Sequence, residues 1–391
     1  MRVTNACFHG VLVMLLLLLT KRQLGTRSRH FRLTGTITAL NCGFFPLLWF
    51  FGLLYYTDVT STVWILLLWL SFNAERHWCA AGAGLVACCF RQTNIVWVIF
   101  FAALLSFRIL DRHRKQWVAK GWLESDEKGG HPHSTGITVL SDYLMDFIRI
   151  LIRSKTPVSE VSNFVQSLLR QAMPYILVGI CFSLFVLWNK GIALGDRTAH
   201  QACLHFMQLS YCSTFIALMG WPRTFSLPRI RDTALYCYRN KRTIAFMLLL
   251  LFISVHFFTY AHPYLLADNR HYTFYLWRRF YMRHWLCPYM AIPAYLYSLI
   301  AVWRTLPDQP TAFRLCFTLC CALNLVPQKL LEFRYFIVPY LIWRLSQPRW
   351  NWAQLLAELL TFLFINAVTV YLFLYRPFVW PHEPGTQRFM W

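Results

Sequence analysis

The sequence predicts an all-α integral membrane protein, on three observations. Of its 391 residues, 57% are hydrophobic, 18% are aromatic and only 14% are charged, which is too apolar for a soluble globular chain. The apolar residues form runs long enough to cross a bilayer as helices, and most charged residues lie between the runs. Counting these runs predicts a polytopic helical bundle with about 11 to 12 crossings.

The chain is strongly basic, with 38 Lys and Arg against 16 Asp and Glu and a formal net charge of +22. The basic residues do not gather on a polar domain but punctuate the apolar runs, as the positive-inside rule produces. This distribution argues against nucleic acid as a partner. It predicts contact with membrane lipid, either anionic headgroups or a phosphorylated lipid.

The 13 cysteines indicate neither a disulfide framework nor a metal site. Most of them lie inside apolar runs, where a thiol behaves as a small hydrophobic group. The sequence contains no Cys-x-x-Cys pair and no Cys/His spacing suited to zinc. We therefore predict no bound metal and no other cofactor.

We predict three sections along the chain: N-terminal spans in residues 1–110, a cytosolic loop in residues 111–172, and C-terminal spans with motif loops in residues 173–391. The first run, Val3–Leu19, is predicted to be a retained span because Lys21 and Arg22 follow it where a signal peptide needs small residues.

A polar corner from Arg91 to Asn94 interrupts the long apolar run Ala80–Phe107. A single helix would place Arg91 near the bilayer centre, so two shorter legs that meet at the corner are predicted. In the second section, charges of both signs precede two amphipathic stretches, Asp142–Ile152 and Val158–Leu169, which are predicted to lie along the membrane surface.

The loop that we call the central loop, Tyr260–Arg279, carries His, Asp, Asn, Arg and Tyr between the apolar runs Ile244–Thr259 and Trp285–Val302. Ionisable groups close to hydrocarbon cost free energy, so several of them together indicate a functional site. The alternative is an ordinary interfacial loop, with Tyr and Trp as an aromatic belt and Arg reaching the headgroups.

The distribution of basic residues assigns the loops to two sides of the membrane. The loops predicted to be cytosolic hold roughly twice as many Lys and Arg as the opposite loops, as the positive-inside rule requires. Asp58 and four motif segments then share the side away from the cytosol: 91–94, 195–200, the central loop, and residues 327–335, which we call the corner. Charged groups beside lipid suit chemistry on a lipid-borne phosphate.

These segments carry a close resemblance to a known family. The chain resembles the endoplasmic reticulum alpha-1,2-glucosyltransferases that use dolichyl phosphate glucose, and the resemblance rests on five blocks: Phe90–Ile95, Gly195–Phe206, Tyr264–Tyr275, Val326–Phe336 and Gln387–Trp391. It implies a GT-C-type multi-spanning enzyme of the endoplasmic reticulum membrane. The implied reaction adds the third and last glucose to the dolichyl-diphosphate-linked oligosaccharide used in N-glycosylation.

The resemblance also implies inversion at the sugar, because a beta-linked donor yields an alpha bond. Such a transfer needs a base for the acceptor hydroxyl and positive groups for the departing phosphate. The candidates for the phosphate are Arg270, His271, Lys329 and Arg334.

The candidates for the base are Asp58, Asp268 and Glu332, with Asp196 as a further acid. An equally open alternative is that Asp196, Asp268 and Glu332 each pair with a neighbouring arginine, whereas Asp58 has no arginine near it in the sequence. The remaining motif residues on this side are Arg91, Asn94, Asp196, Arg197 and His200.

The chain departs from the family pattern at its start. Family members begin with an extra span and a long first lumenal loop that bears an Asp-Glu pair, so we expect this chain to lack that segment. The rival hypothesis is therefore a catalytically impaired form that acts as a non-enzymatic membrane protein, such as a channel accessory subunit or a lipid-binding protein.

Overall fold

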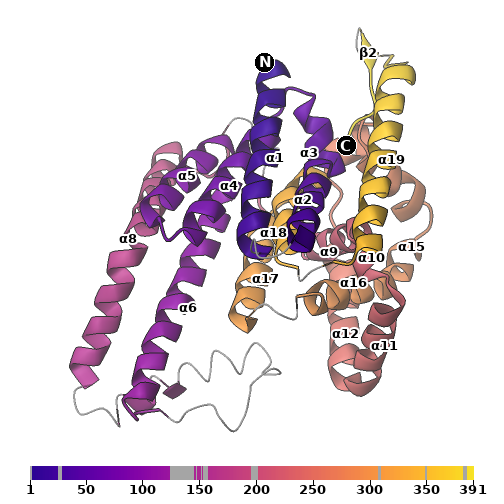
Figure 1. Ribbon diagram of the computed structural model, residues 1–391. Helices are drawn as coiled ribbons and strands as arrows, with labels where there is room; N and C mark the ends of the chain where they lie inside the picture. The colour runs from indigo at the N-terminus through magenta and orange to yellow at the C-terminus, as the bar shows by residue number, and fades with distance from the viewer. Residues whose placement is uncertain are drawn as a thin grey trace. The chain divides into compact units, whose positions relative to one another are not determined.

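The computed structural model describes residues 2–24, 29–123, 145–146, 148–150, 152, 157–194, 201–306, 310–347, 350–381 and 385–391. This part of the chain is almost entirely helical, and its one sheet is a small antiparallel pair of strands (Figure 1). The chain divides into two compact units, which are described separately. The first consists of Met1–Leu66, Ala193–Asp308 and Cys321–Trp391, and the second of Leu67–Ile192 and Gln309–Cys320.

The first unit contains most of the helices. They are α1 (Arg2–Leu24), α2 (Arg29–Gly43), α3 (Pro46–Gly52), the start of α4 (Asp58–Asn73), α9 (Met207–Met219), α10 (Trp221–Thr224), α11 (Leu227–Arg239), α12 (Lys241–Phe257), α13 (Pro263–Ala267), α14 (Tyr272–Leu276), the π-helix η3 (Trp277–Tyr281), α15 (Cys287–Met290), α16 (Ile292–Arg304), the 3₁₀-helix η4 (Phe333–Phe336), α18 (Ile337–Leu345) and α19 (Trp352–Tyr375). The strands β1 (Phe378–Val379) and β2 (Thr386–Gln387) follow α19.

Helix breaks in this unit have local causes. Helices α2 and α3 meet at a bend of 61°, and α3 begins at Pro46, whose ring and missing N–H stop a preceding helix but suit a first turn. Helix α19 begins with a capping box: the Asn351 side chain accepts from the Gln354 N–H at 2.8 Å, and the Gln354 side chain accepts from the Asn351 N–H at 3.2 Å.

The centre of the first unit joins α2, α18 and α19 around a buried ion pair. Arg344 donates to both carboxylate oxygens of Glu358, at 2.8 and 2.7 Å, and both side chains are almost fully buried. Asn41 donates to the same carboxylate at 2.7 Å and Tyr340 at 3.0 Å. The guanidinium also lies 3.8 Å from the ring centre of Trp350. A buried ion pair whose carboxylate accepts from three different side chains fixes which helices meet.

The second unit consists of the rest of α4 with α5 (His77–Phe90), the 3₁₀-helix η1 (Gln92–Asn94), α6 (Ile95–Ala119), α8 (Pro157–Asn189) and most of α17 (Thr311–Leu325). Helices α5 and α6 both pack on α8. They form the two predicted legs, since the helix breaks at Arg91, which has an extended backbone, and η1 separates them.

The structure confirms an all-α polytopic membrane protein. Within the described residues, four helices are long and apolar enough to span a membrane, or up to six if two bent pairs each count as one span. Three shorter apolar helices, His77–Phe90, Met207–Met219 and Thr311–Leu325, account for further predicted crossings. The number of full-length spanning helices is thus smaller than the predicted crossings, because several apolar runs form short or broken helices.

The predicted division at residue 172 falls inside a helix. The amphipathic stretch Val158–Leu169 and the apolar run that follows it form one 33-residue helix, α8. Residues 142–144, 147 and 151 of the other amphipathic stretch, Asp142–Ile152, lie outside the described residues. The three sections with their cytosolic and lumenal assignments remain a prediction.

Candidate functional site

The central loop is shaped by two short helices that leave four polar residues between them. His262 Nδ1 accepts from the Tyr264 N–H at 3.1 Å and so caps α13, while Pro263 occupies its first position. Helix α13 ends at Ala267 and α14 begins at Tyr272. Asp268 to His271 are therefore held in the turn between two helix ends.

Within this turn Asp268 and Arg270 form a two-point ion pair. Arg270 Nε lies 2.9 Å from Asp268 Oδ1 and Nη2 lies 2.7 Å from Oδ2, while the Arg270 N–H donates to Oδ1 at 3.1 Å. His271 Nε2 lies 3.6 Å from Oδ2. Burial alone would raise the pKa of Asp268, but the hydrogen bonds from Arg270 and the charges of His271 and Arg270 lower it overall.

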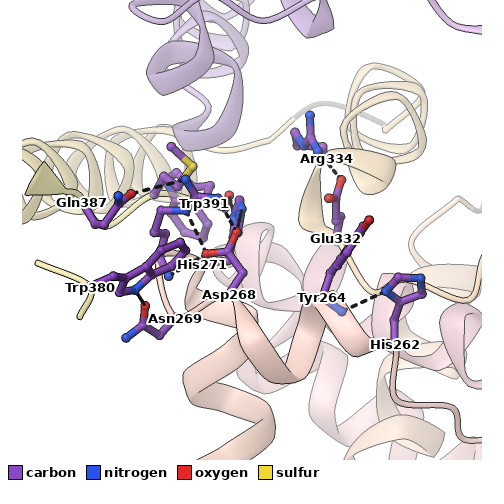
Figure 2. A network of polar contacts seen from close by, with 12 residues as sticks. His262, Tyr264, Asp268, Asn269, His271, Glu332, Arg334, Trp380, Gln387 and Trp391 are labelled. Carbon is purple, nitrogen blue, oxygen red and sulfur yellow. Dashed lines mark hydrogen bonds and ion pairs between the residues drawn. The ribbon is translucent and has the colours of Figure 1, made fainter. Parts of the chain in front are cut away.

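The C-terminal segment, residues 385–391, lies along this turn. The Met390 N–H donates to the Arg270 carbonyl at 2.9 Å, and the Tyr272 N–H donates to the Met390 carbonyl at 3.2 Å. Figure 2 shows His271 beside Trp391, whose main-chain oxygen lies 2.6 Å from His271 Nδ1. A strand-like contact therefore holds the turn on one side.

Trp380, just after strand β1, covers the other residues of the turn. Its indole N–H donates to Asn269 Oδ1 at 2.6 Å (Figure 2). The Arg270 guanidinium lies 4.8 Å from the centre of the Trp380 ring and 3.4 Å from Gln387 Oε1. Arg270 is thus held by a carboxylate, an amide and an aromatic face.

The corner is positioned by the segment that precedes α9. The His205 N–H donates to the Val326 carbonyl at 3.0 Å, and Gln208 Nε2 donates to the carbonyls of Gln328 and Leu330 at 3.1 and 2.9 Å. His205 is fully buried: its Nδ1 lies 3.3 Å from the Gln328 carbonyl, and its Nε2 lies 3.5 Å from the Tyr260 N–H.

These contacts require a neutral imidazole, since Nδ1 must donate while Nε2 accepts. Burial lowers the pKa of His205 to about 4, against smaller raising effects of its backbone hydrogen bonds to Gln328 and Lys329. The neutral His205 side chain therefore connects the corner to the start of the central loop through hydrogen bonds.

Arg334 in the corner lies between two carboxylates. Its Nη2 is 2.5 Å from Glu332 Oε2 and its Nη1 is 3.9 Å from Asp58 Oδ2. The guanidinium also lies 5.1 Å from the ring centre of Tyr56. Burial alone would lower the pKa of Arg334, but Glu332 and Asp58 raise it overall, so this cation is permanent.

Trp391 and Met390 connect the central loop to the corner. The Trp391 ring meets Tyr272 edge to face, with centroids 5.2 Å apart, and lies 5.9 Å from the Phe333 ring. The Tyr56 hydroxyl lies 3.8 Å from the Met390 sulfur. The structure thus brings two clusters into one connected network, one around Asp268 and Arg270 and one around Arg334.

The predicted site residues divide into four groups. The candidates Asp58, Asp268, Arg270, His271, Glu332 and Arg334 take part in this network. Lys329 lies in the same corner, half-buried, and its ammonium forms no ion pair with a described residue. Asp196, Arg197 and His200 lie outside the described residues.

Arg91 and Asn94 belong to the second unit, where Arg91 ends α5 and the buried Asn94 donates to the Ala87 carbonyl at 2.8 Å. Asn94 therefore has a structural contact at the corner between α5 and α6.

One expectation is corrected by the structure. Asp58 has no arginine near it in the sequence, yet its buried carboxylate lies 3.9 Å from Arg334, which is 276 positions away. The turn before α4 and the corner meet through the fold, which local sequence does not show. As the first residue of α4, Asp58 also accepts from the Thr62 hydroxyl through its carbonyl, at 2.7 Å.

Sequence reasoning missed several members of the network as site residues. Trp380, Gln387 and Trp391 complete the surroundings of Arg270 and His271, and His205 fixes the corner. The available signal was the motif character of Gln387–Trp391 and of the segment before α9. Among the described residues, no group of three or more His, Cys, Asp or Glu side chains is arranged to hold a metal ion.

Comparison with known proteins finds relatives along the whole chain. The DIE2/ALG10 family profile matches residues 1–345. A Mus musculus protein named Dol-P-Glc:Glc(2)Man(9)GlcNAc(2)-PP-Dol alpha-1,2-glucosyltransferase is 34% identical over 404 residues, covering 100% of this chain and 80% of the mouse protein. Proteins of the same name are similar at 35% identity in Homo sapiens, covering 100% of this chain and 80% of the relative, and in Arabidopsis thaliana, covering 91% and 76%. No solved structure matches the chain significantly.

Proposed function

This chain belongs to the DIE2/ALG10 family, and we propose that it transfers glucose from dolichyl phosphate glucose to a dolichyl-diphosphate-linked oligosaccharide. The observation that carries the proposal is the full-length similarity to relatives whose names specify this donor and an acceptor with two glucoses. The step is then addition of the third glucose in alpha-1,2 linkage. We place it in the endoplasmic reticulum membrane, in a bundle of the GT-C type.

The reaction needs positive charge where the glycosidic bond to phosphate breaks, because negative charge grows on the departing dolichyl phosphate. In this proposal the corner supplies the positive charge. Lys329 offers an ammonium that no described carboxylate neutralises, and Arg334 offers a permanent cation on the same short segment. Asp58 and Glu332 hold Arg334 from two sides and so position it for the phosphate.

Inversion requires the acceptor hydroxyl to attack the sugar on the face opposite the phosphate. The base that takes the proton of this hydroxyl must therefore lie on that face. A carboxylate already bound to Arg334 would lie on the phosphate side, which disfavours Glu332 and the buried Asp58. Asp268 lies in the other cluster, and its side chain is 20% exposed.

We therefore propose Asp268 as the base, with Arg270 and His271 orienting it. Its lowered pKa keeps it ionised, and it takes the proton late, when the acceptor hydroxyl has become acidic in the transition state.

The test is transfer by the purified full chain in lipid nanodiscs, with synthetic dolichyl phosphate glucose and a diglucosylated lipid-linked acceptor. The expected product carries one more glucose, and its anomeric proton coupling in NMR reports an alpha bond. Dolichyl phosphate mannose and a nucleotide-linked glucose serve as donor controls that should not be used.

A chain that is folded and binds dolichyl phosphate but transfers nothing contradicts the proposal. That result favours the rival hypothesis of a non-enzymatic lipid-binding protein.

A further inference from the structure

Helices α11 and α12 are joined at Asn240 and bent by 99°. Helix α12 has 17 residues, which gives it a length of about 25 Å, close to the thickness of a bilayer's hydrocarbon core. Large apolar side chains are exposed along it, including Phe246, Leu249 and Phe252. These properties suit a helix that crosses the membrane, and with α12 in that position the 99° bend would direct α11 along the membrane surface.

One face of α11 packs against α16. Thr233 is buried on this face, and Arg229 Nη1 donates to the Arg304 carbonyl of α16 at 3.1 Å. The Arg304 guanidinium in turn lies 4.9 Å from the ring centre of Tyr236. These contacts with α16 fix the rotation of α11 about its axis, and hence the direction in which its other faces point.

A second face of α11 is apolar and exposed. Leu227, Ile230, Ala234 and Tyr238 follow the three- and four-residue spacing of one helix side. Leu227 is 82% exposed, Ile230 41% and Tyr238 70%. Such a stripe on a helix that lies along a membrane is typical of an interfacial helix, whose apolar side enters the boundary between headgroups and acyl chains.

The rest of the surface around α11 is basic. Arg231, Arg239, Lys241 and Arg242 are all exposed, and Asp232 is the one acid between Leu227 and Arg242. The Lys241 ammonium lies 4.7 Å from the ring centre of Tyr238, next to the apolar stripe. Positive side chains beside a shallow apolar stripe match an anionic phospholipid, whose charged headgroup lies just above its acyl chains.

We propose that α11 lies in the headgroup layer and binds anionic phospholipid through these four basic residues. The central loop follows the opposite end of α12, so this lipid site is separated from the candidate glucosyl-transfer site by the length of that helix. The proposal therefore stands whether or not the chain transfers glucose. It also agrees with the predicted cytosolic side of this segment, the leaflet in which anionic lipids are concentrated.

The test places the photo-crosslinking residue p-benzoylphenylalanine at Ile230 in the full chain, reconstituted in phosphatidylcholine vesicles that contain a minority of phosphatidylserine. Mass spectrometry of the adducts should show lipid as the main product, with phosphatidylserine enriched above its share of the vesicle. The same probe at Asp232, outside the stripe, should give far fewer lipid adducts.

A charge variant, Arg231→Gln with Arg239→Gln, Lys241→Gln and Arg242→Gln, should keep the lipid adducts and lose the enrichment. High salt on the parent chain should reduce the enrichment in the same direction without any substitution, because salt screens exposed charges. Protein adducts in place of lipid adducts at Ile230 would overturn the proposal and indicate a protein partner. A phosphatidylserine share equal to that of the vesicle, or one unaffected by salt, would overturn it as well.

Discussion

The first unit contains two arginine–carboxylate contacts that differ in their surroundings. Arg344 and Glu358 are 3% and 0% exposed, and Asn41 and Tyr340 complete the hydrogen bonding of the carboxylate. In the corner, Arg334 and Glu332 are 20% and 18% exposed; Glu332 precedes the short 3₁₀-helix η4 and Arg334 lies in its first turn.

This difference in burial indicates that the first contact stabilises the fold, whereas the second can take part in binding a ligand. A buried carboxylate that accepts from an arginine, an asparagine and a tyrosine has little capacity left for a ligand, so the pair serves to specify packing. A partly exposed arginine in a short 3₁₀-helix keeps donors that a phosphate oxygen can reach. The two contacts therefore predict opposite responses to mutation, one in stability and the other in activity.

The largest expected effect is on stability at the buried pair. Glu358→Ala leaves the Arg344 cation buried without its partner, which should lower the free energy of unfolding by about 3–5 kcal/mol. The measurement is thermal unfolding in nanodiscs, with Glu332→Ala as the matched control, for which a smaller loss is expected because Glu332 is partly exposed and Arg334 keeps its contact with Asp58.

Adding Arg344→Leu to Glu358→Ala should recover part of the lost stability, since no unpaired charge then remains. If Glu332→Ala unfolds as readily as Glu358→Ala, the distinction between the two contacts is wrong.

The next effect concerns the proposed base. Asp268→Asn keeps the size of the side chain but removes its capacity to accept a proton, so kcat for glucose transfer should fall by about 10²–10⁴-fold with a smaller change in KM. The same assay on Asp58→Asn should show a weaker effect, which arises through Arg334. A larger loss for Asp58→Asn would make Asp58 the better candidate for the base.

How much of the fold and of the candidate site the sequence predicts depends on the kind of contact. The all-α membrane class follows from composition, and the break at Arg91 follows from the cost of a cation inside the bilayer. The pairing of Asp268 with Arg270 and of Glu332 with Arg334 was one of two open alternatives, because side chains two positions apart on an irregular segment can reach each other.

Contacts between distant segments could not be predicted in this way. Asp58 with Arg334, and Trp380 with Asn269, depend on how the helices pack. The lengths of the helices were also missed, because apolar composition does not reveal where a short helix ends inside an apolar run. Family resemblance identified the motif segments without showing which of their side chains touch.

A smaller effect is expected at Lys329. Lys329→Gln removes a point charge near the proposed position of the leaving phosphate and leaves the carboxylates around Arg334 unchanged. We expect kcat/KM for dolichyl phosphate glucose to fall by about tenfold, in line with the loss of one electrostatic contact of modest strength. The melting temperature should stay close to that of the parent. A loss of melting temperature without a loss of kcat/KM would give Lys329 a structural role.

A separate effect is a pH dependence of stability at His205. Its pKa is lowered from 6.5 to about 4 in the folded chain, so the unfolded state binds the proton more tightly. The stability from the neutral imidazole is therefore fully present above pH 6.5 and is lost progressively as the pH falls from 6.5 towards 4.

The melting temperature should decrease over this window, and His205→Gln should flatten the decrease. An unchanged slope in the variant would assign the acid sensitivity to other groups.

The measurement that tests the central claim most directly compares Arg334→Lys with Arg344→Lys in the same preparation. For each variant, kcat/KM for glucose transfer is determined per folded molecule, together with the melting temperature. We predict that Arg334→Lys lowers kcat/KM and leaves the melting temperature nearly unchanged, because a lysine cannot replace a guanidinium held between two carboxylates. Arg344→Lys should lower the melting temperature and leave kcat/KM of the folded fraction near that of the parent. Equal loss of activity per folded molecule in both variants, or normal transfer by Arg334→Lys, would contradict the assignment of the corner as the phosphate site.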